Sequence, residues 1–197
     1  RSFDIDPVFL LGKAIDDLLS SEEELTGDVY WSRAWAQVKD YVARPSKRIR
    51  PSLLLSGFQI ACPSEVIPKG VYQFAAALEL LHAFMLIHDD VADHAPTRRG
   101  APSLHRLFES QGVEARQAEN QAIVVGDALF ALAIEGMLSC QMPGASKATS
   151  FLLAICRQTA AGQFLDLSAS GMPVSEISLF QTLRIAHLKT ARYGFVA

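Results

Sequence analysis

A long apolar stretch that ends in a cluster of carboxylates constrains this chain more than any other feature of its sequence. Only Glu79 and His82 interrupt the apolar residues of positions 74–87, and an acidic cluster occupies positions 89–93. A stretch that is apolar nearly all round predicts a buried helix, covering about residues 68–93, at the centre of the fold. The two polar residues also make the apolar stretch too short and too polar for a membrane span.

The acidic cluster has the spacing of a cation site. On a helix Asp89 and Asp93 lie one turn apart on nearly the same face, whereas Asp90 points about 100° away. Magnesium takes one or two carboxylates together with water and phosphate, and Arg98 and Arg99 offer planar forks for phosphate oxygens. A solvated acidic helix end is the alternative, but carboxylates that follow a buried helix are costly without a cation. We therefore predict a magnesium and diphosphate site, with Asp89 and Asp93 as the metal ligands.

Helical periodicity continues along almost the whole chain. The other expected helices cover residues 7–20, 27–42, 51–61, 103–110, 114–140, 145–168 and 174 to the end, and residues 95–102 form a loop. No segment of alternating β-branched residues competes with them, so the predicted fold is an all-α domain of packed, mostly long helices.

Composition narrows the classes of protein to which this chain can belong. Half of the 197 residues are hydrophobic and 20% are charged, which is typical of a single globular domain. A net charge of −3 gives no general attraction to nucleic acid. Cys62, Cys140 and Cys156 are odd in number and lack zinc-site spacing, which favours reduced thiols and a cytoplasmic location.

A second basic cluster precedes the third expected helix. Lys47, Arg48 and Arg50 place three cations within four residues. His82 lies two turns before Asp89 on almost the same helical face, so it either reaches the same cavity or is an ordinary core histidine.

Two further polar pairs interrupt later apolar helices. Gln163 and Asp166 are three residues apart on one helix face, and Lys189 and Thr190 offer a cation and a hydroxyl. Each pair alone would be read as an ordinary surface or capping group. Their occurrence together with the acidic and basic clusters indicates one site.

The ordered set of these motifs resembles the trans-isoprenyl diphosphate synthases, the polyprenyl synthetase family that includes farnesyl and geranylgeranyl diphosphate synthases. The resemblance covers residues 44–197 and rests on Lys47-Arg48-Ile49-Arg50-Pro51, His82, Asp89-Asp90-x-x-Asp93, Arg98-Arg99-Gly100, Gly126-Asp127, Gly162-Gln163-x-x-Asp166 and Lys189-Thr190. It implies the isoprenoid synthase fold, a bundle of long, mostly antiparallel helices around a central cavity, and a homodimer.

The resemblance also implies a role for each matching position. Magnesium would be held by Asp89 and Asp93, with Asp90 completing the acidic cluster. An allylic diphosphate would be held by Arg98, Lys189 and Thr190, with Gln163 and Asp166 in the same pocket. Isopentenyl diphosphate would be held by Lys47, Arg50, His82 and Arg99. The implied reaction is head-to-tail condensation. The residues expected to limit product length are Leu81, Phe84 and Met85. The aromatic Phe84, five positions before Asp89, makes the sequence more similar to geranylgeranyl synthases.

One family feature is missing between Lys189 and Ala197, where no second aspartate-rich motif occurs. We therefore expect a partial polypeptide that is inactive alone and active within a longer chain. A non-catalytic regulatory subunit of a prenyl synthase is one alternative. A class I terpene cyclase is another, although Lys47, Arg50 and Arg99 argue against it because a cyclase needs no isopentenyl diphosphate site.

Overall fold

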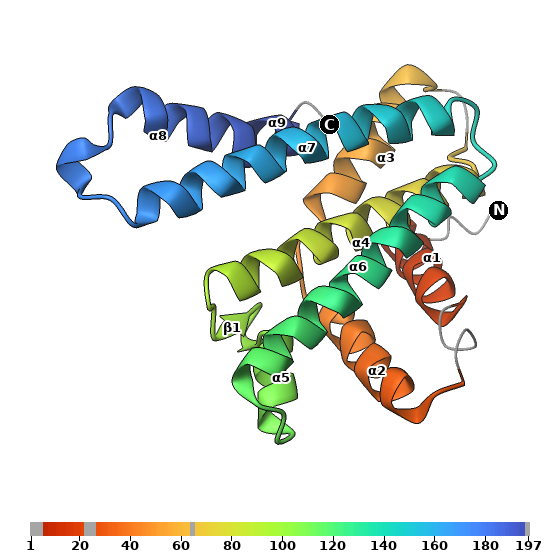
Figure 1. Cartoon of the computed structure of the whole chain (residues 1–197). Coiled ribbons are helices and arrows are strands. Elements are labelled where there is room, and N and C mark those ends of the chain that lie inside the picture. Colours follow the sequence, from red (N-terminus) through yellow and green to blue (C-terminus); the bar gives the residue numbers. More distant parts are fainter. Residues whose placement is uncertain (1–5, 22–26, 64–65, 196–197) are drawn as a thin grey trace. The chain divides into compact units, whose positions relative to one another are not determined.

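The computed structural model describes residues 6–21, 27–63 and 66–195, and nearly all of them are helical, so the all-α prediction is confirmed (Figure 1). Ala197, the last residue of the stretch that lacks the second motif, lies outside these ranges. The contacts divide the chain into two compact units, residues 1–143 and residues 144–197. The single domain inferred from length stays a prediction.

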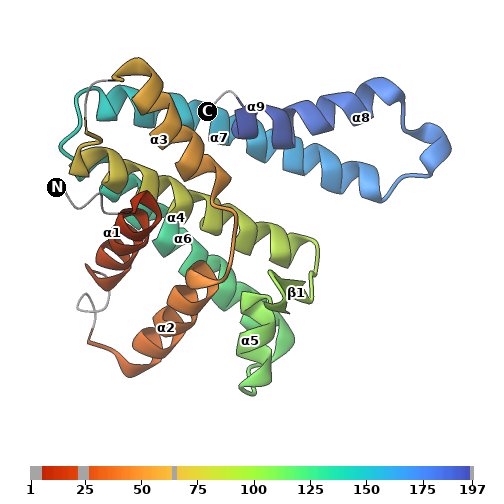
Figure 2. The same cartoon turned by 180° about the vertical axis from the view of Figure 1, so that it is seen from behind.

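Helix α4 (Lys69–Ala92) is the centre of the first unit, as the apolar stretch predicted. The other helices of this unit are α1 (Pro7–Ser21), α2 (Val29–Ala43), α3 (Ile49–Ala61), α5 (Leu104–Ser110) and α6 (Ala115–Ser139). Helices α1, α3, α5 and α6 all contact α4, and α6 runs alongside it (Figures 1 and 2). Fourteen residues of α4 are buried, including Glu79 and Asp90.

Small residues let α4 and α6 approach closely. A Cβ on Gly126 would lie 2.8 Å from the His88 ring, and a Cβ on Gly136 would lie 3.3 Å from the Cβ of Ala77. Glycine at these two places therefore sets the spacing between the helices, and with it the position of the acidic end of α4.

Within the described ranges, α4 and α6 are the two helices long and apolar enough to cross a membrane by length and composition. Such helices are weak evidence for a span, because core helices pass the same test. In α4, 72% of the apolar window is buried inside the protein, against 44% in α6. The expectation that this stretch is too short and too polar for a membrane span is therefore wrong for α4 as a whole, and it is the burial of α4 that fits a core helix.

The connection after α4 contains a short hairpin where the sequence predicted a plain loop. Strands β1 (Thr97–Arg98) and β2 (Ala101–Pro102) pair antiparallel. Arg99 and Gly100 between them have φ values of 53° and 78°. Positive φ at both central residues is the requirement of the tight turn whose twist matches that of a hairpin.

The second unit is a helical hairpin. Helix α7 (Ala145–Ser170) is followed by the 3₁₀ turn η1 (Val174–Glu176), α8 (Leu179–Ala186), the π-helical turn η2 (His187–Ala191) and α9 (Arg192–Phe195). The last three contact α7, and α8 folds back beside it (Figure 1). The predicted continuous helix from Val174 is wrong at its start, because Ser178 and Gln181 form a capping box that begins a new helix.

Candidate functional site

The carboxylates at the end of α4 point in two directions. The side chain of Asp89 is 26% exposed and Asp93, the C-cap residue, is exposed, whereas Asp90 is buried. The Asp93 N–H donates to the Asp89 carbonyl over 2.9 Å, so the two residues are one turn apart as predicted. Two carboxylates thus lie at the surface end of the helix, and the third enters the core.

Asp90 is engaged by the buried Tyr41 and the half-buried Arg98. The Tyr41 hydroxyl donates to Asp90 Oδ2 over 2.8 Å, and Arg98 donates to Oδ1 from Nε over 2.7 Å and also from Nη2. The hydrogen bond to Asp90 raises the pKa of Arg98, and burial followed by the charge of Asp90 raises the pKa of Tyr41. Arg98 Nη2 also lies 3.6 Å from Asp89. Arg98 therefore links the buried carboxylate to the exposed end of the helix.

A cavity of about 390 Å³ lies beside this network and gathers the basic residues. It is lined by Ser46, Lys47, Arg48, Ile49, Arg50, Glu79, His82, Leu86, Arg98 and Arg99. The four residues predicted to hold isopentenyl diphosphate are all in this list, although they come from three separate parts of the chain. Arg48 and Arg99 have positive φ values of 42° and 53°, a conformation that costs energy outside glycine and is common at functional sites.

His82 is a neutral hydrogen-bond partner of Arg50. Its Nε2 lies 3.1 Å from Arg50 Nη1, and since arginine can only donate, the ring nitrogen accepts. Burial, followed by the charges of Arg50, Arg99 and Arg98, lowers the pKa of His82 to about 3. The residue lines the cavity and its Nε2 is engaged there by Arg50, so both interpretations of the sequence apply.

Protonation of His82 should destabilise the fold in acid. Its pKa is near 6.5 when unfolded and about 3 when folded, so stability present above pH 6.5 is lost as the pH falls towards 3. Between pH 6.5 and 5 the loss should be about 2 kcal/mol. Urea titrations at several pH values measure the free energy of unfolding of wild type and His82→Gln. Subtracting the two pH dependences cancels the contribution of His105, whose pKa is also lowered by burial. An identical pH slope in both proteins would contradict this prediction.

Glu79 is a site residue that the sequence did not assign. It is 1% exposed and accepts from Arg99 Nη2 over 3.3 Å. Burial raises its pKa and the Arg99 charge opposes that shift. The available signal was a lone carboxylate inside an apolar stretch, since such a group is rarely buried without a cationic partner. Glu79 holds the Arg99 side chain at the wall of the cavity.

In the second unit, Lys189 Nζ donates to Asp166 Oδ2 over 2.7 Å. Gly162 makes this pairing possible, because a Cβ there would collide with the backbone of Leu188 and Lys189. Lys189 and Thr190 lie in the π-helical turn η2, a form of helix that is frequent at functional sites. Both amide atoms of Gln163 are buried without a hydrogen-bond partner among the described residues.

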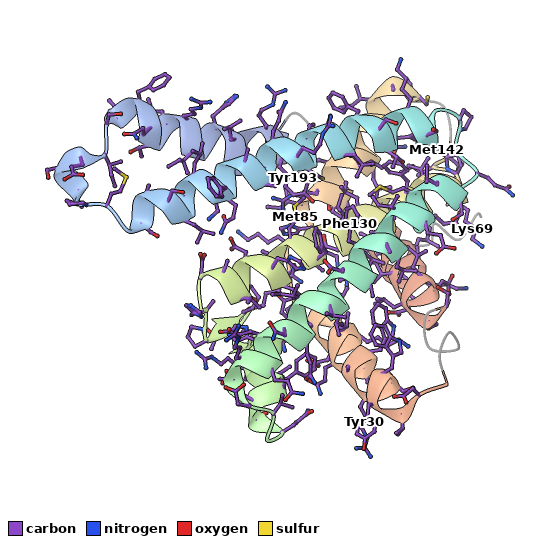
Figure 3. All side chains as sticks on the ribbon, in the orientation of Figure 1. Tyr30, Lys69, Met85, Phe130, Met142 and Tyr193 are labelled. Carbon is purple, nitrogen blue, oxygen red and sulfur yellow. The ribbon has the colours of Figure 1, made fainter. Side chains whose placement is uncertain are left out.

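The residues expected to limit product length lie in different environments. The Phe84 ring packs against His88 and Phe130, with ring centroids 4.6 and 5.0 Å apart. Leu81 is fully buried, whereas Met85 is half-buried. Figure 3 labels Met85 on α4 and Phe130 on α6.

The exposed carboxylates suit magnesium. Asp89 and Asp93 provide hard oxygen donors at one end of a helix, and magnesium commonly keeps waters and takes phosphate oxygens alongside two carboxylates. No group of three His, Cys, Asp or Glu side chains among the described residues could hold a metal, so a complete cage of protein ligands is not found there. The donor set therefore matches a metal shared with a diphosphate.

Comparison with known proteins points to one family. The polyprenyl synthetase family model matches residues 33–197. The geranylgeranyl pyrophosphate synthase of Geoglobus acetivorans is 30% identical over 161 residues, which cover 81% of this chain and 44% of that protein. Several other curated relatives are matched over 34% to 51% of their length, so the chain spans about half of them or less.

Solved structures agree with the family match. The geranylgeranyl pyrophosphate synthase of Corynebacterium glutamicum, complexed with isoprenyl diphosphate and magnesium, has a TM-score of 0.80 at 27% identity, covering 95% of this chain and 56% of that one. A geranyltransferase from Legionella pneumophila has a TM-score of 0.74 at 30% identity, covering 94% and 62%.

Proposed function

Because this chain belongs to the polyprenyl synthetase family, we propose that it is the part of a prenyl diphosphate synthase that binds two diphosphates and ionises one of them. The observation that carries the proposal is the basic cavity beside the acidic end of α4, where Arg98 lines the cavity and also contacts Asp89. Cations and hard carboxylates at one place are the chemistry that a magnesium diphosphate requires.

The proposed reaction is head-to-tail condensation. The carbon–oxygen bond of an allylic diphosphate breaks, and its electron pair leaves with the diphosphate. The double bond of isopentenyl diphosphate then forms the new carbon–carbon bond, and a proton from its neighbouring carbon passes to the released diphosphate. Magnesium, when bound at Asp89 and Asp93, supplies charge neutralisation for the leaving group.

Residues of the cavity position the second substrate. Lys47, Arg50 and Arg99 bind the isopentenyl diphosphate group by charge-assisted hydrogen bonds, which are stronger than neutral ones. His82 and Glu79 keep the Arg50 and Arg99 side chains in place. Fixed cations stabilise developing charge without reorganising during the reaction.

The test is product analysis with the complete gene product. Purified protein is incubated with labelled isopentenyl diphosphate, magnesium and dimethylallyl, geranyl or farnesyl diphosphate, and products are identified by mass spectrometry. Longer prenyl diphosphates support the proposal, and the expected product is geranylgeranyl diphosphate. Cyclic hydrocarbons from farnesyl diphosphate alone would indicate a terpene cyclase, and diphosphate binding without turnover would indicate a regulatory subunit.

The cytoplasmic location and the homodimer stay predictions. Cell fractionation can check the location, and light scattering can check the oligomeric state.

Two substitutions should separate the two substrates. Lys47→Ala removes an exposed cation of the cavity and should raise the KM for isopentenyl diphosphate about tenfold with little change for the allylic substrate. Lys189→Ala, at a position that the family resemblance assigns to the allylic diphosphate, should do the reverse. Initial rates with each substrate varied in turn measure both constants. Equal effects of both variants on one substrate would reject this assignment.

Product length should depend on Phe84 and Met85. Replacing both by alanine removes the Phe84 ring, which packs against Phe130 of α6, and the half-buried Met85 side chain, and products should lengthen by at least one five-carbon unit. Mass spectrometry of the products measures the change, with Phe151→Ala as control because Phe151 is an exposed residue of α7. An unchanged product distribution would place the floor of the tunnel elsewhere.

A further inference from the structure

Tyr41 of α2 and Arg44, the C-cap residue of that helix, approach the proposed diphosphate site from inside the first unit. Tyr41 is 1% exposed and Arg44 is 7% exposed, and neither lines the basic cavity. The Arg44 guanidinium lies 4.9 Å from the centroid of the Tyr41 ring, a cation–π contact. The two residues therefore form one packed group.

Tyr41 acts on Arg98 through Asp90. Its hydroxyl donates to one oxygen of the buried carboxylate, and Arg98 donates from Nε and Nη2 to the other. With both oxygens engaged, the carboxylate is held against rotation, and the guanidinium plane of Arg98 is held with it. Arg98 Nη1 makes no hydrogen bond to any residue in the described ranges, although the side chain lines the cavity.

Arg44 fixes the backbone that carries Arg98. Its Nη1 donates to the carbonyl oxygen of Arg98 over 3.2 Å and to that of Pro102 over 2.8 Å. These carbonyls lie on the two strands of the hairpin, so one guanidinium joins both. Asp40 Oδ2, 3.3 Å from Arg44 Nη2, holds the other side of the group.

We propose that Tyr41 and Arg44 are positioning residues that hold Arg98 ready for an allylic diphosphate oxygen, a role that rests on the proposed function. Without the Tyr41 hydroxyl, Asp90 could turn and Arg98 could move fully onto Asp89, which is 3.6 Å away. Diphosphate binding would then have to order the arginine, and ordering a long side chain weakens affinity.

Calorimetric titration of the complete gene product with inorganic diphosphate, at constant magnesium, tests the proposal. Tyr41→Phe removes only the hydroxyl and should weaken diphosphate binding about fivefold. Tyr72→Phe, a buried tyrosine of α4 away from the cavity, is the matched control and should change it less than about twofold. The decisive comparison is a double-mutant cycle, in which Tyr41→Phe should have almost no further effect on top of Arg98→Ala.

A general loss of stability would weaken binding equally in both backgrounds, so an additive cycle would overturn the proposal, as would unchanged affinity in Tyr41→Phe. If Tyr41→Phe does not fold, Arg44→Lys gives a second route, because lysine has one terminal nitrogen, whereas Arg44 uses Nη1 for the two carbonyls and Nη2 for Asp40. Its effect should likewise vanish on Arg98→Ala. The cycle needs no turnover, so a protein that fails to condense isoprenoids would reject the proposed function while leaving the coupling measurable.

Discussion

Alanine at Asp89 or Asp93 should lower the rate of condensation by about a hundredfold or more while leaving the helical fold intact. Asp93 is exposed and Asp89 is half-buried at the end of α4, so neither substitution opens a cavity in the core. Ionisation depends on neutralising the charge of the departing diphosphate, so the loss should appear mainly in kcat. Steady-state kinetics over a range of magnesium concentrations measures the effect.

Asp16→Ala is the matched control, since Asp16 is an exposed carboxylate of α1. Circular dichroism of all three variants should match wild type. If Asp89→Ala and Asp93→Ala turned over as fast as wild type, these carboxylates would have no role in the reaction. Asp90→Ala, by contrast, would strip Tyr41 and Arg98 of their shared acceptor and should destabilise the fold as well.

Arg99→Ala is expected to lower the free energy of unfolding by about 3 kcal/mol, beyond any effect on substrate binding. Glu79 is 1% exposed and forms an ion pair with Arg99, so the substitution leaves a buried carboxylate without this cation. Urea denaturation followed by circular dichroism measures the loss. The KM for isopentenyl diphosphate should rise in the same variant, because the cavity loses a cation.

A second substitution separates these two effects. Glu79→Gln combined with Arg99→Ala should recover most of the stability, since an amide is far cheaper to bury than a carboxylate, while the high KM remains. Lys47→Ala serves as control because Lys47 is exposed, and it should change KM with little change in stability. A double variant as unstable as Arg99→Ala would show that the Glu79 charge is not the cause.

Local sequence patterns predicted the central helix and the directions of its acidic side chains. Helix periodicity and the apolar stretch of residues 74–87 predicted α4 and its burial, because a helix that is apolar nearly all round is stable only inside a core. The one-turn spacing of Asp89 and Asp93 likewise separated them from Asp90, since direction on a helix depends only on residue number. These properties depend on interactions within a few residues along the chain.

The partners of the buried charges were decided only by the tertiary structure. Tyr41 and Asp90 are 49 residues apart, Arg44 and the Arg98 carbonyl 54, and Glu79 and Arg99 20, so no periodicity relates them. Each pairing exists because helix packing brings two polar groups to one place in the core, where each must find a partner. The sequence alone predicted a set of cations and carboxylates for the site without Glu79, whereas the packing of α2 and the hairpin against α4 decided which buried charges meet and are held in place.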